Sequence, residues 1–239
     1  MLEVSGLSKR FRGLVAVKDV SFEIKRNEIV ALIGPNGAGK TTCFNLIAGA
    51  LKPSSGSVFL DGEDITGLAP ERIAVRGLVR TFQIVRPMRG MTVLENVMVG
   101  AFAQTSDVAV AADMAAKAIS RIGLSAKAND LASSLTLPDL KMLELARALA
   151  ASPRVLLLDE VMAGLRPAER ERIATIVREL HAGGMTVLLI EHVMRVVMAL
   201  AGRVIVLHHG EKLAEGTPAE MGANPKVIES YLGTKTKLA

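Results

Sequence analysis

One stretch of the chain matches the phosphate-binding pattern G-x-x-x-x-G-K-[ST], namely Gly34-Pro35-Asn36-Gly37-Ala38-Gly39-Lys40-Thr41. Glycines let the backbone curl so that successive N–H groups point at phosphate oxygens, and the start of a helix adds its positive end. Lys40 can then reach the β- and γ-phosphates, and the Thr41 hydroxyl can bind magnesium. The stretch therefore predicts a site for a nucleoside triphosphate and Mg²⁺.

Two acids and a histidine follow apolar runs in the second half of the chain. Asp159 and Glu160 come directly after the run at 155–158, and His192 follows the run at 185–190. Beside a phosphate site, Asp159 would join the magnesium shell and Glu160 would orient the attacking water. His192 would contact the γ-phosphate if its strand ends at the ligand-binding edge of the sheet. The plainer alternatives are a strand that ends in solvated acids and a structural histidine.

The elements that must position these residues alternate between strands and helices. Apolar runs and turn residues predict strands at 2–4, 15–24, 28–33, 58–60, 155–158, 185–190 and 204–207, with a hairpin turn at Asp61-Gly62. The helical pattern predicts helices at 41–51, 93–102, 108–122, 140–149, 168–181 and 193–200. Strands that alternate with helices point to a mostly parallel sheet.

We therefore predict an α/β fold of the P-loop class. Residues 1–90 and 151–239 would form a nucleotide-binding core with an N-terminal antiparallel β part. Residues 91–150 would form an inserted helical subdomain, because alanine and methionine rise there and turn residues become rare.

Composition excludes several classes of function. The 239 residues include six Phe, one Tyr and no Trp, too few rings for a platform that stacks single-stranded bases. The net charge of +5 is small for a duplex-binding protein, so we expect no nucleic-acid partner. No apolar run reaches the ~18–20 residues of a spanning helix, and the N-terminus has no signal-peptide pattern. The single Cys43 cannot form an intrachain disulfide, which suggests a reducing compartment.

Five arginines lie close together with one acid beside them: Arg72, Arg76, Arg80, Arg86 and Arg89. The strip is either a solvated helix face or a surface for an acidic partner or lipid head groups. Three methionines lie beside or after it: Met88, Met91 and Met98. Methionine suits a groove for a partner helix, although core packing is its commoner use.

From Leu2 to about Gly233 the chain resembles the ATP-binding subunits of ABC transporters, most of all the branched-chain amino-acid uptake group. Thr81-Phe82-Gln83 resembles the Q-loop of that family, Ala163-Gly164-Leu165 its D-loop, and His192 its switch histidine. The segments at 91–97 and 215–218 are also similar. The resemblance implies that Gln83 senses magnesium, the attacking water and the membrane partner.

The resemblance also implies a set of site residues. The catalytic residues would be Glu160, His192 and Gln83, and the metal residues Thr41, Gln83 and Asp159. The ATP-binding residues would be Phe11, which stacks on adenine, with Gly34, Pro35, Asn36, Gly37, Ala38, Gly39, Lys40, Thr41 and Thr42. The dimer interface would contain Thr136, Pro138, Asp139, Ala163, Gly164 and Leu165.

The implied function is ATP hydrolysis coupled to transport. Two such subunits, in a homo- or heterodimer, would close around two ATP molecules and drive membrane permease subunits. A substrate-binding protein would be an indirect partner. The location would be cytoplasmic, on the inner face of the cell membrane.

The strongest departure from the family is the signature segment, where Leu135-Thr136-Leu137-Pro138-Asp139 replaces a glycine-rich pattern close to L-S-G-G-Q. Thr136 keeps a hydroxyl, Pro138 removes a backbone N–H, and Asp139 adds a negative charge unless it points away. As the start of a helix the segment is favourable. We expect intact ATP binding and weakened closure across this segment.

Two alternatives to a working transport ATPase stay open. One is an ATP-binding regulatory or structural subunit with weak hydrolysis, and the other is a soluble ABC ATPase of iron–sulfur assembly. A GTPase is disfavoured, because the guanine-reading N/T-K-x-D motif is absent.

Overall fold

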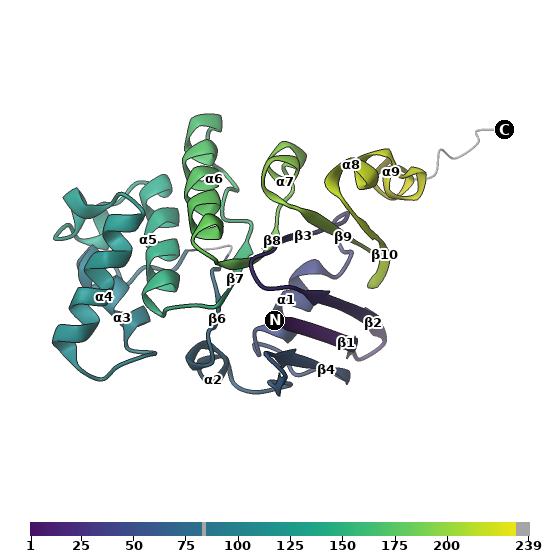
Figure 1. The fold of residues 1–239 in the computed structure, drawn as a ribbon, viewed down its shortest axis with the longest axis horizontal. Coiled ribbons are helices and arrows are strands. Elements are labelled where there is room, and N and C mark those ends of the chain that lie inside the picture. Colours follow the sequence, from purple (N-terminus) through teal and green to yellow (C-terminus); the bar gives the residue numbers. More distant parts are fainter. Residues whose placement is uncertain (83–84, 233–239) are drawn as a thin grey trace. The chain divides into compact units, whose positions relative to one another are not determined.

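Figure 1 shows the computed structural model, which describes residues 1–82 and 85–232. The chain forms two compact units, one built from residues 1–69 and the chain from 186 onward, the other from residues 70–185. The α/β fold is confirmed. The predicted helical insertion, residues 91–150, lies within the second unit, and its boundaries as a domain stay a prediction. Gln83 lies outside the described residues.

The first unit contains an antiparallel sheet, as predicted for the N-terminal part. Its strands are β1 (Leu2–Phe11), β2 (Leu14–Ile24), β4 (Ser55–Leu60) and β5 (Glu63–Asp64), in the order β2-β1-β4-β5. The hairpin turn at Asp61-Gly62 is confirmed, because Leu60 pairs with Glu63 across it. Both turn residues have positive φ, 51° and 83°, which suits the twist of a two-residue hairpin.

The same unit contains a second group of strands that carries the phosphate-binding stretch. These strands are β3 (Ile29–Ile33), β8 (Thr186–Ile190), β9 (Arg203–His208) and β10 (Glu211–Gly216), in the order β10-β9-β3-β8. β3 is parallel to β8 and to β9, and β10 is antiparallel to β9. Every residue of β3 and β8 is buried, as expected for parallel strands covered on both faces.

The helices of the first unit are α1 (Lys40–Ile47), α7 (Met194–Leu200), α8 (Pro218–Ala223) and α9 (Pro225–Leu232). The predicted helix at 41–51 is too long at its end. Gly49 has a φ of +74°, a left-handed conformation that commonly ends a helix.

The second unit contains a parallel strand pair and most of the helices. β6 (Leu78–Arg80) pairs with β7 (Val155–Asp159). The helices are α2 (Pro70–Val75), α3 (Val93–Ala101), α4 (Val108–Arg121), α5 (Leu137–Ala150) and α6 (Pro167–Ala182), with short 3-10 turns at Ser125–Lys127 and Ala132–Ser134. The helices predicted at 93–102, 108–122, 140–149 and 168–181 are confirmed. The sequence missed α2 and β6, which are short.

In the second unit α3 and α5 come very close together (Figure 1). A Cβ added at Gly100 would lie 2.0 Å from the carbonyl oxygen of Arg147, so a side chain there would push the helices apart. A capping box at Thr92 and Glu95 fixes the start of α3. Across the part of the chain that the structure describes, no helix has the length and apolar character needed to span a membrane.

Candidate active site

The phosphate-binding stretch forms a tight loop between β3 and α1. A Cβ at Gly34 would lie 2.1 Å from the carbonyl oxygen of Leu207, and one at Gly39 would lie 2.5 Å from that of Ala16. Gly37 and Gly39 have φ angles of +79° and +100°. The glycines are therefore required by close backbone contact and by left-handed conformation, as the motif predicted.

Lys40 folds back over its own loop. Its Nζ donates to the carbonyl oxygens of Gly34 and Pro35, at 2.7 and 3.0 Å, and the residue is buried. The lysine thus has its charge at the centre of the loop. The first turn of α1 contains no acid that would offset the positive end of the helix. Thr41 is exposed and Thr42 is half-buried beside it. The loop and the helix start together provide a concentrated positive field for phosphate.

His192 lies at the same sheet edge as this loop. β3 is in register with its parallel neighbours, with Ala31 opposite Leu189 and Ile33 opposite Val206. The carboxyl ends of β3 and β8 therefore meet at one edge, and the exposed His192 follows the end of β8 by two residues. This is the placement that the sequence predicted, and its contact with a γ-phosphate stays a prediction.

Phe11 lies at the end of β1, beside the turn into β2, where it pairs with Leu14. Its ring is 42% exposed, and the Nζ of Lys9 lies 5.3 Å from the ring centroid. β2 then passes the loop, since the Ala16 carbonyl oxygen is the atom that a side chain at Gly39 would strike. An exposed ring on the hairpin that flanks the loop is compatible with adenine stacking, which stays a prediction.

In the second unit, Asp159 ends β7 as a buried acid, 1% exposed. Its Oδ2 accepts a hydrogen bond from Nη2 of Arg80 at 2.6 Å, and its backbone N–H donates to the Thr81 hydroxyl at 3.3 Å. The buried Oδ1 has no hydrogen-bond partner among the residues that the structure describes. A buried carboxylate oxygen without a partner suits a metal ion, because the ion would supply the missing positive contact.

The interpretation of Arg80 as part of an exposed arginine strip is wrong. Only 8% of its side chain is exposed, because β6 pairs with β7 and places Arg80 opposite Leu157. Arg72, Arg86 and Arg89 are exposed, but only Arg72 lies in a helix, so the strip is not one helix face. The sequence missed the role of Arg80, because strand pairing and not local pattern buries it.

Glu160 has a strained backbone. Its φ is +48°, in the left-handed region that residues other than glycine rarely adopt. Its carbonyl oxygen accepts from the N–H of Ala163 at 3.0 Å, which holds the turn into Gly164 and Leu165. Six other described residues that are not glycine share this conformation, so the angle shapes the turn after β7, and the catalytic role of Glu160 stays a prediction.

The signature segment forms the start of α5, as predicted. Thr136 is the residue before the helix, and Pro138 lies within its first turn. Asp139 is buried, accepts from the Thr136 hydroxyl at 2.6 Å and pairs with Nζ of Lys127 at 2.5 Å. Burial alone would raise the pKa of Asp139, but these two contacts hold the pKa below its usual value. The expected extra charge is therefore neutralised within the chain.

The segment lies against the predicted D-loop within the same unit. A Cβ at Gly164 would lie 3.5 Å from Cδ2 of Leu137. Gly164 has a φ of +78° and Leu165 is buried. The structure thus brings together the two segments that were predicted to form a dimer interface. It does not test the interface itself.

A groove of about 510 Å³ opens on the second unit. Large apolar side chains in its lining are unusually exposed: Val75 56%, Phe82 55%, Val99 42% and Phe102 44%. Charged side chains also line it: Glu71, Arg80, Glu144 and Arg147. The three methionines that suggested a groove, Met88, Met91 and Met98, are not among its lining residues.

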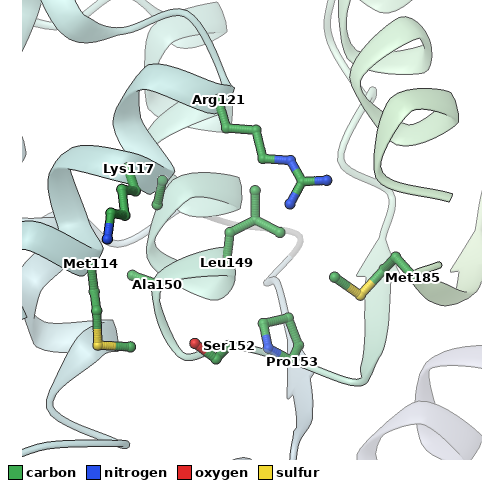
Figure 2. A pocket seen from close by; sticks show the side chains of 9 residues that line it. Met114, Lys117, Arg121, Leu149, Ala150, Ser152, Pro153 and Met185 are labelled. Atoms are coloured by element: carbon green, nitrogen blue, oxygen red, sulfur yellow. The ribbon is translucent and has the colours of Figure 1, made fainter. Parts of the chain in front are cut away.

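A second hollow of the same unit, about 330 Å³, lies at the end of α4 (Figure 2). Leu149, Pro153 and Met185 give it an apolar wall, and Lys117 and Arg121 reach over it. Lys117 forms an ion pair with Asp113 at 2.5 Å. None of the predicted site residues that the structure describes lines this hollow.

Comparison with known proteins decides the family. Residues 17–163 match the ABC transporter family model, and residues 211–236 match the model of the branched-chain amino acid ATP-binding cassette transporter. The chain is 44% identical to the high-affinity branched-chain amino acid transport ATP-binding protein LivG of Salmonella typhimurium, over 98% of both chains. It belongs to the ABC transporter ATP-binding family.

Other relatives of this ABC protein agree. It is 40% identical to the branched-chain amino acid transport ATP-binding protein BraF of Pseudomonas aeruginosa, over 98% of both chains. A solved ATP-binding cassette in an ADP conformation matches with a TM-score of 0.89 and 32% identity, over 98% of both chains. The ABC ATPase fold and the homology to branched-chain amino acid transport subunits are therefore confirmed.

Proposed function

We propose that this protein is an ATP-hydrolysing subunit that energises a transporter for branched-chain or related amino acids. The observation that carries the proposal is the loop at residues 34–41, with its obligatory glycines and its buried lysine. The names of the relatives supply the class of cargo.

ATP binding would use groups of the first unit. The backbone N–H groups of the loop and Lys40, once it exchanges its two carbonyl partners for phosphate oxygens, would hold the triphosphate. The exposed ring of Phe11 would stack on adenine and would help to fix the orientation of the nucleotide.

Hydrolysis would use acids of the second unit together with His192. Thr41 and the Oδ1 of Asp159 would hold Mg²⁺, which neutralises charge that develops on the phosphates. Glu160 would accept a proton from the attacking water, and His192 would contact the γ-phosphate. Gln83 lies outside the described residues, and its role as a sensor of metal and water rests on the family alone.

Partners would meet two surfaces. The signature segment and the residues 163–165 would face ATP on a second ATP-binding subunit, so that two subunits close around two nucleotides. The apolar groove beside Phe82 would receive a helix of a membrane permease subunit, because four large apolar side chains are exposed in its lining next to charged ones. With such partners the protein would work at the cytoplasmic face of the membrane.

Purified protein tests the proposal directly. We expect wild type to hydrolyse ATP, and Glu160→Gln to lower kcat by about 10²–10⁴-fold, the usual contribution of a general base. Glu160→Gln should also accumulate as an ATP-bound dimer in size-exclusion chromatography. The matched control is Glu171→Gln, which changes an exposed glutamate of α6 that pairs with Arg178. Equal rates for Glu160→Gln and wild type would refute the assignment of Glu160.

One observation favours a second function, that of an ATP-binding subunit with weak hydrolysis. Pro138 cannot offer a backbone N–H at the signature segment, and the Thr136 hydroxyl is engaged with Asp139. Pro138→Gly distinguishes the two functions. A rise in hydrolysis and in ATP-driven dimerisation would show that the native segment limits closure, whereas unchanged values would remove this alternative.

A further inference from the structure

Arg80 and Asp159 form a buried ion pair in the second unit. The two side chains are 8% and 1% exposed, and Nη2 of Arg80 lies 2.6 Å from Oδ2 of Asp159. The backbone fixes the pair, because the Thr81 N–H donates to the carbonyl oxygen of Leu157 at 2.9 Å and β6 runs parallel to β7. The guanidinium of Arg80 thus supplies a positive charge to the acid that we assign to the metal site.

The same guanidinium reaches the apolar groove. Arg80 lines the groove, and its Cζ lies 5.5 Å from the ring centroid of Phe82, which is 55% exposed there. The backbone N–H of Phe82 donates weakly to Oε1 of Glu144 at 3.4 Å, and Arg147 pairs with that glutamate. One side chain therefore contacts both the acid of the metal site and a residue of the proposed docking surface.

The charges at Asp159 make Arg80 and a divalent cation competitors. A buried carboxylate needs a positive partner, and Arg80 is that partner when no metal ion is bound. A divalent cation at Oδ1 would lie close to the guanidinium on Oδ2, and two cations at such a distance repel strongly where water is excluded. Glu71 and Glu144, which line the groove with Arg80, offer the guanidinium other acceptors.

We propose that Arg80 is a positioning residue that holds Asp159 in the absence of Mg²⁺, competes with Mg²⁺ for that carboxylate, and turns toward the groove when the metal binds. The proposal rests on the proposed function, because it takes Asp159 as the metal acid. It gives the groove a direct electrostatic signal of metal occupancy, carried by the contact of Arg80 with Phe82.

A magnesium titration tests the competition. Purified protein is freed of divalent cations on a chelating resin, loaded with ATP and separated from unbound nucleotide, and MgCl₂ is then titrated while bound metal is followed by calorimetry at low temperature. We expect Arg80→Met to bind Mg²⁺ about tenfold more tightly than wild type, because the opposing charge is gone. Arg80→Lys should remain close to wild type, because it keeps the charge. Arg178→Met is the matched control, since it removes an arginine that pairs with Glu171 on the exposed face of α6.

The titration can refute either the competition between Arg80 and Mg²⁺ or the proposed function as an ATP-binding subunit. Equal or weaker Mg²⁺ binding by Arg80→Met would overturn the competition, and would leave Arg80 as a purely structural partner of Asp159. Failure of wild type to bind ATP at all would overturn the proposed function instead. If Arg80→Met does not fold, the Arg80→Gln variant in the same titration decides, with the same expected direction.

The movement toward the groove has its own readout. The chain has no tryptophan, so Phe82→Trp introduces one tryptophan that can be excited selectively, at a ring position 5.5 Å from the Cζ of Arg80 in the parent structure. With ATP bound, addition of Mg²⁺ should shift the emission of Phe82→Trp, and the shift should be lost in the double variant with Arg80→Met. An emission that does not respond to Mg²⁺ would refute the transfer of the signal to the groove.

Discussion

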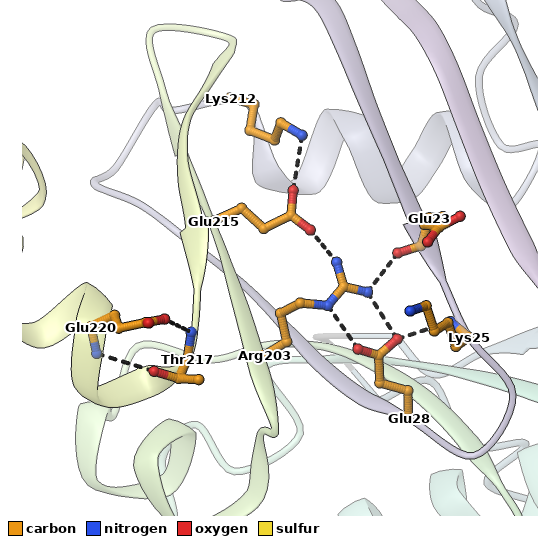
Figure 3. Close-up of polar contacts among 8 residues, drawn as sticks. All are labelled: Glu23, Lys25, Glu28, Arg203, Lys212, Glu215, Thr217 and Glu220. Atoms are coloured by element: carbon orange, nitrogen blue, oxygen red, sulfur yellow. Dashed lines mark hydrogen bonds and ion pairs between the residues drawn. The ribbon is translucent and has the colours of Figure 1, made fainter.

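Arg203 at the start of β9 forms hydrogen bonds and ion pairs with residues of the segment 23–28 and of β10, all in the first unit (Figure 3). Its Nε and Nη2 donate to the two carboxylate oxygens of Glu28, at 2.7 and 2.8 Å, and Nη2 also donates to the carbonyl oxygen of Glu23 at 2.7 Å. Its Nη1 pairs with Glu215 on β10. Because β9 pairs with β3, which leads into the phosphate-binding loop, this cluster supports the proposed site.

Replacement of Arg203 by Met should destabilise the protein measurably. The side chains of Arg203 and Glu28 are 21% and 20% exposed, so the variant would leave a mostly buried Glu28 carboxylate without its cation. Glu215, 27% exposed, would lose one of two cations, because Lys212 also pairs with it at 2.9 Å. Loss of one partner from a fully buried pair costs about 3–5 kcal/mol, and partial exposure lowers our expectation to about 2 kcal/mol. For a chain of this size that corresponds to a fall in Tm of about 4–8 °C.

The loss should depend on pH. Burial alone would raise the pKa of Glu28, but the hydrogen bonds from Arg203 and the Lys25 N–H outweigh burial and hold the pKa below its usual value of 4.5. A depressed carboxyl pKa stabilises the folded state above the unfolded pKa, and this stabilisation is lost as the pH falls through the folded pKa. The difference between wild type and Arg203→Met should therefore be full at pH 7 and should shrink below about pH 4.5.

Thermal unfolding at pH 7 and at pH 4, followed by circular dichroism, measures both effects. The control is Arg178→Met, which breaks a more exposed pair with Glu171, with side chains 44% and 67% exposed. We expect that control to cost less than about 0.5 kcal/mol. If Arg203→Met unfolds at the same temperature as Arg178→Met at pH 7, the cluster does not stabilise the fold and the reasoning fails.

Three further predictions concern the site and its surroundings. Gly39→Ala should abolish ATP binding in a fluorescent-nucleotide assay, because its Cβ would lie 2.5 Å from a backbone oxygen, whereas Gly222→Ala, with open space around it, should bind normally. Cys43 should resist iodoacetamide at pH 8 in the native protein and react only on unfolding, because burial raises its pKa to about 12; fast labelling of native protein would contradict this. Val99→Glu in the groove should reduce co-purification with membrane permease subunits, while Val110→Glu, 47% exposed and outside the groove lining, should not; equal recovery would exclude the groove as the docking surface.

The parts of the fold that local pattern specifies could be predicted from the sequence. The apolar runs of β3, β7 and β8 are buried along their whole length, and the motif placed the loop between β3 and α1 correctly. The three-residue strand β6 gives no periodic signal, so its pairing with β7 was not predicted.

The residues that strand pairing adds to the site could likewise not be predicted from local sequence pattern. Asp159 was found because it follows an apolar run, but its partner Arg80 lies 79 residues away and only strand pairing brings the two together. The groove was also missed in detail, because its exposed apolar lining comes from separate segments that no single stretch of sequence reveals.

The structure shows how each departure in the signature segment affects the fold and the contact with phosphate. Its two unusual residues, Pro138 and Asp139, have different consequences. The charge of Asp139 is met by Lys127 and Thr136 inside the unit, so it adds little repulsion toward a phosphate. Its replacement by glycine would leave Lys127 without this carboxylate and would lower stability for reasons unrelated to ATP.

Pro138, unlike Asp139, does not affect the stability of the fold but removes a possible contact with phosphate. It lies in the first turn of α5, where backbone N–H groups have no acceptor within the helix, so the missing N–H costs the fold nothing. The same N–H is what a phosphate at the helix start would use. The departures that bear on hydrolysis are therefore donors and not a charge: the N–H that Pro138 lacks and the Thr136 hydroxyl that Asp139 engages. Pro138→Gly restores the first donor and leaves the contacts of Asp139 in place, so it isolates the effect of that donor.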